Sequence, residues 1–161
     1  MEPSDFWPLC EDMLRSGRRV RIPAGGMSMF PRVRDGDIVI IEPVAPAALA
    51  IGDIVVYRGS EAVVAHRLIG RCHRDGRMQL TVKGDFLRRS DGPVLPEAVL
   101  GRVVAVERAN RTMGPDELRA TKLDQLLTGL RLRGGGLVRL ARRAGRAMRK
   151  LLRRRPRSGS P

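Results

Sequence analysis

The stretch Ile51-Gly-Asp-Ile-Val-Val-Tyr-Arg58, followed closely by Ala62-Val-Val-Ala-His-Arg-Leu-Ile69, decides the fold class of this chain. Both runs are rich in β-branched residues, which favour strands, and Gly-Asp or Arg-Gly turn signals flank them. The same kind of run recurs outward along the chain, at residues 18–22, 37–42, 77–83 and 99–107. Short strands separated by turns predict a mainly β fold, either a sandwich or a partly open barrel.

Helical patterns flank this β region. Phe6, Leu9, Met13 and Leu14 recur at helical spacing and predict an N-terminal helix over residues 4–16. A leucine stripe predicts a helix over residues 115–132, and a basic amphipathic pattern predicts another over residues 137–152. We therefore expect an N-terminal helix (1–17), a β domain (18–110), an amphipathic helix (111–133) and a tail (134–161) with a glycine hinge.

Charge is distributed very unevenly along the 161 residues. The net charge is +14, but twelve positive charges and no acid lie between Arg131 and the C-terminus, which leaves +2 for the preceding 130 residues. The extreme basicity therefore belongs to the tail and says little about the β domain.

Cysteines and apolar runs exclude several classes of protein. Cys10 and Cys72 lack the grouping of a disulfide framework or a zinc site, and we expect neither a metal nor a cofactor. No basic start followed by an apolar run marks a secretory signal, and no apolar stretch is long enough to span a membrane. We expect a cytoplasmic or peripherally membrane-associated protein.

Three short motifs could carry chemistry. Ser28 stands in Gly25-Gly26-Met27-Ser28-Met29-Phe30-Pro31, and a serine hydroxyl becomes a nucleophile when a base takes its proton. His66, on the apolar run 62–69, could be that base. Asp85 or Asp91 could hold the histidine ring in the correct tautomer. Each motif alone has a common structural explanation: a turn serine, a core histidine and turn aspartates.

Taken together and in order, the motifs resemble those of the type I signal peptidase family. The resemblance rests on Ser28-Met29-Phe30-Pro31, on His66-Arg67-Leu68-Ile69, on Lys83-Gly84-Asp85 and on Gly101-Arg-Val-Val104. A histidine in the second of these motifs, here His66, is typical of the archaeal, endoplasmic-reticulum and sporulation-type branch of the family. The resemblance covers residues 20–108 and implies a partly open β-barrel or sandwich.

The resemblance also implies roles for individual residues. Ser28 matches the nucleophile, His66 the general base and Asp91 the third triad member, while Asp85 and Lys83 match residues that organise the site. The family often has a serine two positions before the nucleophile, where this chain has Gly26, so an oxyanion hole would rest on backbone N–H groups of Ser28 and Gly26. The family usually has a membrane anchor, which we do not find in this sequence.

The arginine-rich tail suggests a partner surface. A basic amphipathic helix can bind an anionic membrane, so we expect residues 137–155 to contact such a surface. Nucleic acid is the less favoured partner, because the tail lacks aromatic residues that would stack on bases.

These observations predict a serine endopeptidase that cleaves a signal or leader peptide bound as an extended strand. Two alternatives stay open. One is a self-cleaving repressor-type peptidase, which has a similar serine box but uses a lysine base. The other is a non-catalytic module that uses its tail on a membrane or nucleic acid.

Overall fold

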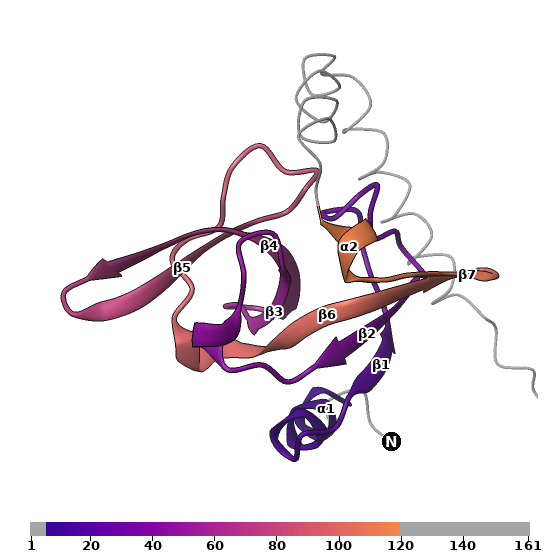
Figure 1. The fold of residues 1–161 in the computed structure, drawn as a ribbon, viewed down its shortest axis with the longest axis horizontal. Coiled ribbons are helices and arrows are strands. Elements are labelled where there is room, and N and C mark those ends of the chain that lie inside the picture. Colours follow the sequence, from indigo (N-terminus) through magenta and orange to yellow (C-terminus); the bar gives the residue numbers. More distant parts are fainter. Residues whose placement is uncertain (1–5, 120–161) are drawn as a thin grey trace, which may run out of the picture. The chain divides into compact units, whose positions relative to one another are not determined.

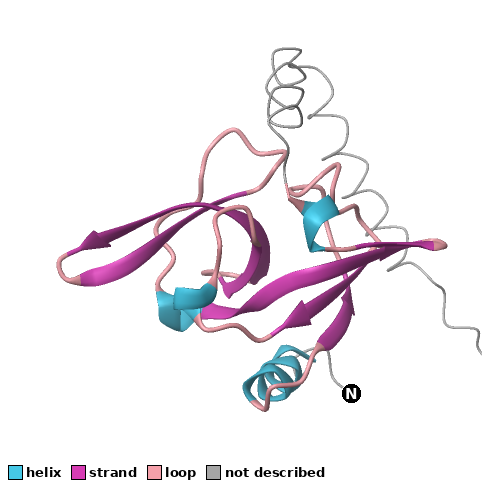
Figure 2. Ribbon diagram, viewed as in Figure 1, coloured by secondary structure: helices cyan, strands magenta, loops and turns pink. Residues whose placement is uncertain are grey.

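A computed structural model describes residues 6–119, and its strands all belong to one antiparallel sheet (Figures 1 and 2). Seven strands form this sheet in the order β1-β2-β6-β3-β4-β5, with β7 also paired to β6. The strands are β1 (Val20–Pro23), β2 (Ile38–Glu42), β3 (Ile54–Arg58), β4 (Val63–Arg74), β5 (Arg77–Lys83), β6 (Val99–Arg108) and β7 (Arg111–Met113). The mainly β fold class predicted from the sequence is confirmed, and the sheet does not close into a barrel.

The strands depart from the predicted ranges at two places. β4 continues to Arg74 and forms a long hairpin with β5, which projects beyond the neighbouring strands in Figure 1. β7 was not predicted, because Arg111–Met113 is too short and polar to show an alternating pattern.

The β3 strand separates two apolar clusters because its successive side chains point to opposite faces of the sheet. Ile54 and Val56 belong to one cluster, and Val55 and Tyr57 to the other; all four are buried. Both faces of the central strand are therefore covered, which explains why its sequence is apolar at consecutive positions rather than at alternate ones.

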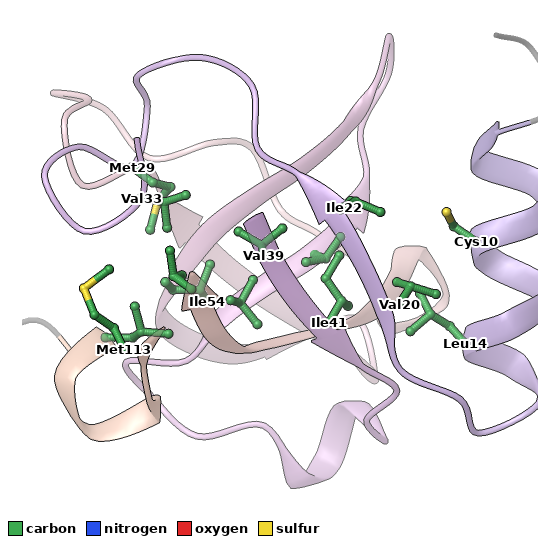
Figure 3. Close-up of a cluster of buried hydrophobic side chains, with 14 residues drawn as sticks. Cys10, Leu14, Val20, Ile22, Met29, Val33, Val39, Ile41, Ile54 and Met113 are labelled. Carbon is green, nitrogen blue, oxygen red and sulfur yellow. The ribbon is translucent and has the colours of Figure 1, made fainter. Parts of the chain in front are cut away.

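The first cluster connects the N-terminal helix with the serine motif (Figure 3). Helix α1 (Phe6–Arg15) confirms the predicted N-terminal helix, and it places Leu14 beside Val20 of β1. At the other end of the cluster lie Met29 and Val33, which are 4% and 7% exposed. Burial of Met29 thus anchors the turn that carries Ser28.

The expected helix over residues 115–132 is corrected by the structure. Helix α2 covers only Pro115–Leu118, and Arg119 has an extended backbone with ψ 130°. A continuous helix through this point is therefore excluded. Two 3-10 helices, η1 (Pro46–Ala48) and η2 (Pro96–Ala98), complete the described elements. The remaining predictions for residues 120–161, including the membrane-binding tail, lie outside the described residues.

Within residues 6–119, no helix is both long and apolar enough to cross a membrane.

Candidate functional site

His66 lies in the middle of the sheet, on β4. Its partner on β3 is Val55, which belongs to the second apolar cluster, so the His66 side chain is on that face of the sheet. The residue is only 5% exposed. The ring Nδ1 contacts the Oδ2 atom of Asp91. Because an ionised carboxylate only accepts hydrogen bonds, Nδ1 is the donor and Nε2 is left as the basic nitrogen.

A backbone hydrogen bond holds Asp91 at this position. Its N–H donates to the Val82 carbonyl on β5, at 2.9 Å. The Asp91 side chain is 29% exposed, so the carboxylate is at the boundary between the apolar cluster and solvent. Of the two aspartates proposed from the sequence, the structure brings Asp91 to the His66 ring.

Asp85 has a different partner. Both of its carboxylate oxygens accept from the guanidinium of Arg67, at 2.8 and 2.6 Å. Arg67 is 3% exposed and also donates to the Gly52 carbonyl at 2.7 Å. A bidentate pair of this kind fixes geometry as well as charge, so it ties the loop after β5 to the residue that follows His66.

The Ser28 backbone packs against the same loop. The Phe86 N–H donates to the Ser28 carbonyl at 2.8 Å, and a Cβ atom on Gly84 would lie 2.8 Å from that oxygen. Only glycine permits this approach without displacement. Lys83, the last residue of β5, pairs with Arg67, the residue after His66, so the Ser28 backbone lies near this end of the histidine strand.

The Ser28 hydroxyl is not yet paired with the base. In the part of the chain that the structure describes, neither the hydroxyl nor the backbone N–H of Ser28 makes a hydrogen bond. Catalytic hydrogen bonds are often long or absent without substrate, so this geometry leaves the hydroxyl available as a nucleophile. The unengaged N–H is equally available as an oxyanion donor.

Gly26 does not supply the second oxyanion donor that we expected from the sequence. Its N–H donates to the Asp35 Oδ1 atom at 2.7 Å, and its φ of 87° places it in the left-handed region. The residue therefore serves the turn, because the hydrogen bond is already taken and the backbone angle favours glycine.

Lys83 and His73 do not join the candidate triad. Lys83 is half-buried, and among residues 6–119 its ammonium group makes no hydrogen bond or ion pair. His73 is exposed on the β4–β5 hairpin.

A buried ion pair, missed by sequence reasoning, supports the segment after Ser28. Asp37 is 5% exposed and accepts from Arg108 at 2.9 and 2.6 Å. The same guanidinium donates to the Arg32 carbonyl at 3.1 Å. The hydrogen bond from Arg108 is the main reason that the pKa of Asp37 lies below its ordinary value, although burial opposes the change.

Tyr57 is the second residue that sequence reasoning missed. Its hydroxyl donates to Asp91 Oδ2 at 2.6 Å. The sequence pattern alone marked Tyr57 only as a strand residue, because the pairing of β3 with β4 decides which side chains lie beside His66.

One edge of β4 is open next to the histidine. Residues 63–66 pair with β3 on one side, whereas pairing with β5 begins only at Arg67. Among the described residues, no other strand occupies that edge. An extended peptide could therefore add there as a further strand.

No group of three or more metal-ligating side chains occurs within residues 6–119. Comparison of the chain with protein-family models and with curated proteins found no match.

Proposed function

We propose that the protein is a serine endopeptidase of the signal-peptidase type. The observation that carries this proposal is the contact between His66 Nδ1 and Asp91, at the level of the Ser28 turn and beside an open strand edge. A buried histidine oriented by a carboxylate has its other ring nitrogen free to act as a base. The ordered sequence motifs support the same chemistry.

Each step of the proposed reaction has a residue of this chain. Ser28 Oγ attacks the scissile carbonyl while His66 Nε2 takes its proton, and Asp91 stabilises the charged ring. The Ser28 N–H donates to the oxyanion, and His66 then protonates the leaving amine. A water molecule, deprotonated by His66, hydrolyses the acyl-enzyme in the second half.

The open edge of β4 supports an extended peptide as the substrate. Hydrogen bonds to residues 63–66 would place the scissile bond beside His66. The family resemblance implies small residues on the acyl side of the cleaved bond.

The proposal is tested with a secretory preprotein in detergent micelles. We expect the purified protein to release the mature form, and we expect Ser28→Ala and His66→Ala to abolish this release. Circular dichroism of both variants controls for folding. Equal behaviour of the wild type and both variants would contradict the proposal.

A non-catalytic peptide-binding module is the second candidate. The hydrogen bond of Gly26 to Asp35 favours it, because it removes one expected oxyanion donor and such a loss costs on the order of 100-fold in rate. In that case, the preprotein would bind equally to the wild type and to Ser28→Ala and would stay uncleaved with both.

A further inference from the structure

Tyr57 lies on the same face of the sheet as the candidate base. In the β3–β4 register, Val55 pairs with His66 and Tyr57 with Val64. Since paired residues share a face and side chains alternate, Tyr57 and His66 are diagonal neighbours. Tyr57 is 5% exposed, so its position is fixed by the apolar cluster around it.

The contacts of Tyr57 converge on the pair that we propose for catalysis. Its hydroxyl donates to Asp91 Oδ2 at 2.6 Å, and His66 Nδ1 contacts that same oxygen. The edge of one ring also faces the other, with the ring centroids of Tyr57 and His66 6.4 Å apart and an interplanar angle of 60°. Tyr57 thus contacts both members of the pair.

The hydroxyl remains a donor under ordinary conditions. Burial raises the pKa of Tyr57 far above its usual range, and the hydrogen bond to Asp91 adds to the effect. The Tyr57 hydroxyl therefore keeps its proton and stays a hydrogen-bond donor to Asp91.

The Tyr57 hydroxyl restricts the rotation of the Asp91 carboxylate. A carboxylate that is 29% exposed can rotate and bind water instead of the imidazole. Two donors that meet at one oxygen oppose this rotation, because turning the carboxylate would break both hydrogen bonds.

We propose that Tyr57 is a positioning residue that fixes the Asp91 carboxylate, and through it the orientation and tautomer of His66. This inference rests on the proposed peptidase function for its kinetic meaning, but the coupling between the three side chains can be measured in the resting protein. Tyr57 itself does not touch the reacting atoms.

The first test is the ring spectrum of His66 in Tyr57→Phe, which keeps the aromatic ring and removes only the hydroxyl. Nitrogen chemical shifts of the imidazole report which ring nitrogen is protonated. With the wild type we expect mainly the Nδ1–H tautomer at alkaline pH. With Tyr57→Phe we expect a mixture of the two tautomers in which the Nε2–H form increases. We expect the same change with Asp91→Asn. Exposed His73 supplies an internal reference that stays unchanged.

The second test separates positioning from substrate binding. Loss of a hydrogen bond to a charged group predicts that kcat on a cleaved preprotein falls about tenfold or more in Tyr57→Phe, with KM within about twofold. Denaturant unfolding of the variant shows whether it remains folded under the assay conditions.

The two readouts distinguish the inference from the function on which it rests. A wild-type His66 spectrum in Tyr57→Phe, together with a shifted one in Asp91→Asn, would overturn the role of Tyr57 and leave the triad intact. A shifted spectrum in both variants would support positioning even if the wild type cleaved no preprotein, a result that would count against the peptidase proposal alone.

Discussion

His66 shows how a single residue depends on its surroundings. A buried imidazole without a partner would have no fixed tautomer, and Asp91 supplies the acceptor that fixes it. Asp85 cannot do so because both of its oxygens bind Arg67. The two aspartates therefore differ in role although both lie in the loop that follows β5.

Replacing Asp91 tests its role as the orienting carboxylate. We expect Asp91→Asn to lower kcat/KM by a factor on the order of 10³ to 10⁴, because an amide can donate to Nδ1 and so favours the wrong tautomer. The measurement is cleavage of a preprotein at fixed pH, with Asp75→Asn on the exposed hairpin turn as the control. Activity within tenfold of the wild type would show that Asp91 is not the orienting carboxylate.

At the residue scale, the sequence could propose the site but not resolve it. It named Ser28, His66 and both aspartates. The choice between Asp91 and Asp85 needed three-dimensional contacts, because both are close in sequence to the end of β5. Tyr57 and the Gly26–Asp35 hydrogen bond depend on strand register and turn geometry, which composition does not encode.

The loop after β5 is the element that joins the serine turn to the histidine strand. Phe86 binds the Ser28 carbonyl, Asp85 binds Arg67, and Asp91 binds His66. Movement of this loop would therefore separate all three members of the proposed triad.

Close packing at Gly84 allows the contact between this loop and the Ser28 turn to be tested. In Gly84→Ala the new methyl group would lie 2.8 Å from the Ser28 carbonyl and 2.9 Å from the Leu87 side chain. We expect the Ser28 turn to shift, with a destabilisation of about 1–3 kcal/mol and a clear loss of kcat. Gly92→Ala in the same loop is the matched control, since no atom lies within 4 Å of its added Cβ. A fully active Gly84→Ala would argue against the tight contact.

The Arg67–Asp85 pair gives a second prediction for the same loop. Breaking a buried ion pair leaves an uncompensated charge, so we expect Asp85→Asn to lower the free energy of unfolding by about 3–5 kcal/mol. The exposed pair of Arg21 with Glu107 provides a comparison, because a solvent-exposed ion pair contributes little to stability and Glu107→Gln should cost much less than Asp85→Asn. Denaturant unfolding measures both, and equal costs would contradict a structural role for Asp85.

At the scale of the whole molecule, ionisation should couple folding to pH. Arg108 keeps the pKa of Asp37 below its ordinary value of 3.8. A lowered pKa means that the folded state releases this proton more readily than the unfolded chain, so the stabilisation is fully present above about pH 4. It is lost as the pH falls through the lower, folded-state pKa.

We therefore expect the stability difference between the wild type and Asp37→Asn to be largest near neutral pH and to shrink below about pH 4. Urea unfolding at several pH values measures this difference. Glu61→Gln, an exposed position without a hydrogen bond or ion pair in the described chain, should give a difference that hardly changes with pH. A constant Asp37→Asn difference down to pH 3 would contradict the proposed coupling.

The overall architecture was the most predictable level. Strands β1, β2, β3 and β5 follow their predicted runs closely because each run is β-branched and bounded by turn residues. Strand β7 and the end of α2 at Leu118 were missed, since short polar strands gain their stability from pairing with a neighbour and helix ends depend on tertiary packing.

The central claim is that Ser28 cuts peptide bonds with the help of His66. Its most direct test is incubation of the protein with a large mixture of peptides, followed by mass spectrometry of the new termini. We predict termini that form with the wild type, follow small residues, and disappear with both Ser28→Ala and His66→Ala. An absence of wild-type-specific termini, or the same termini with Ser28→Ala, would contradict the claim.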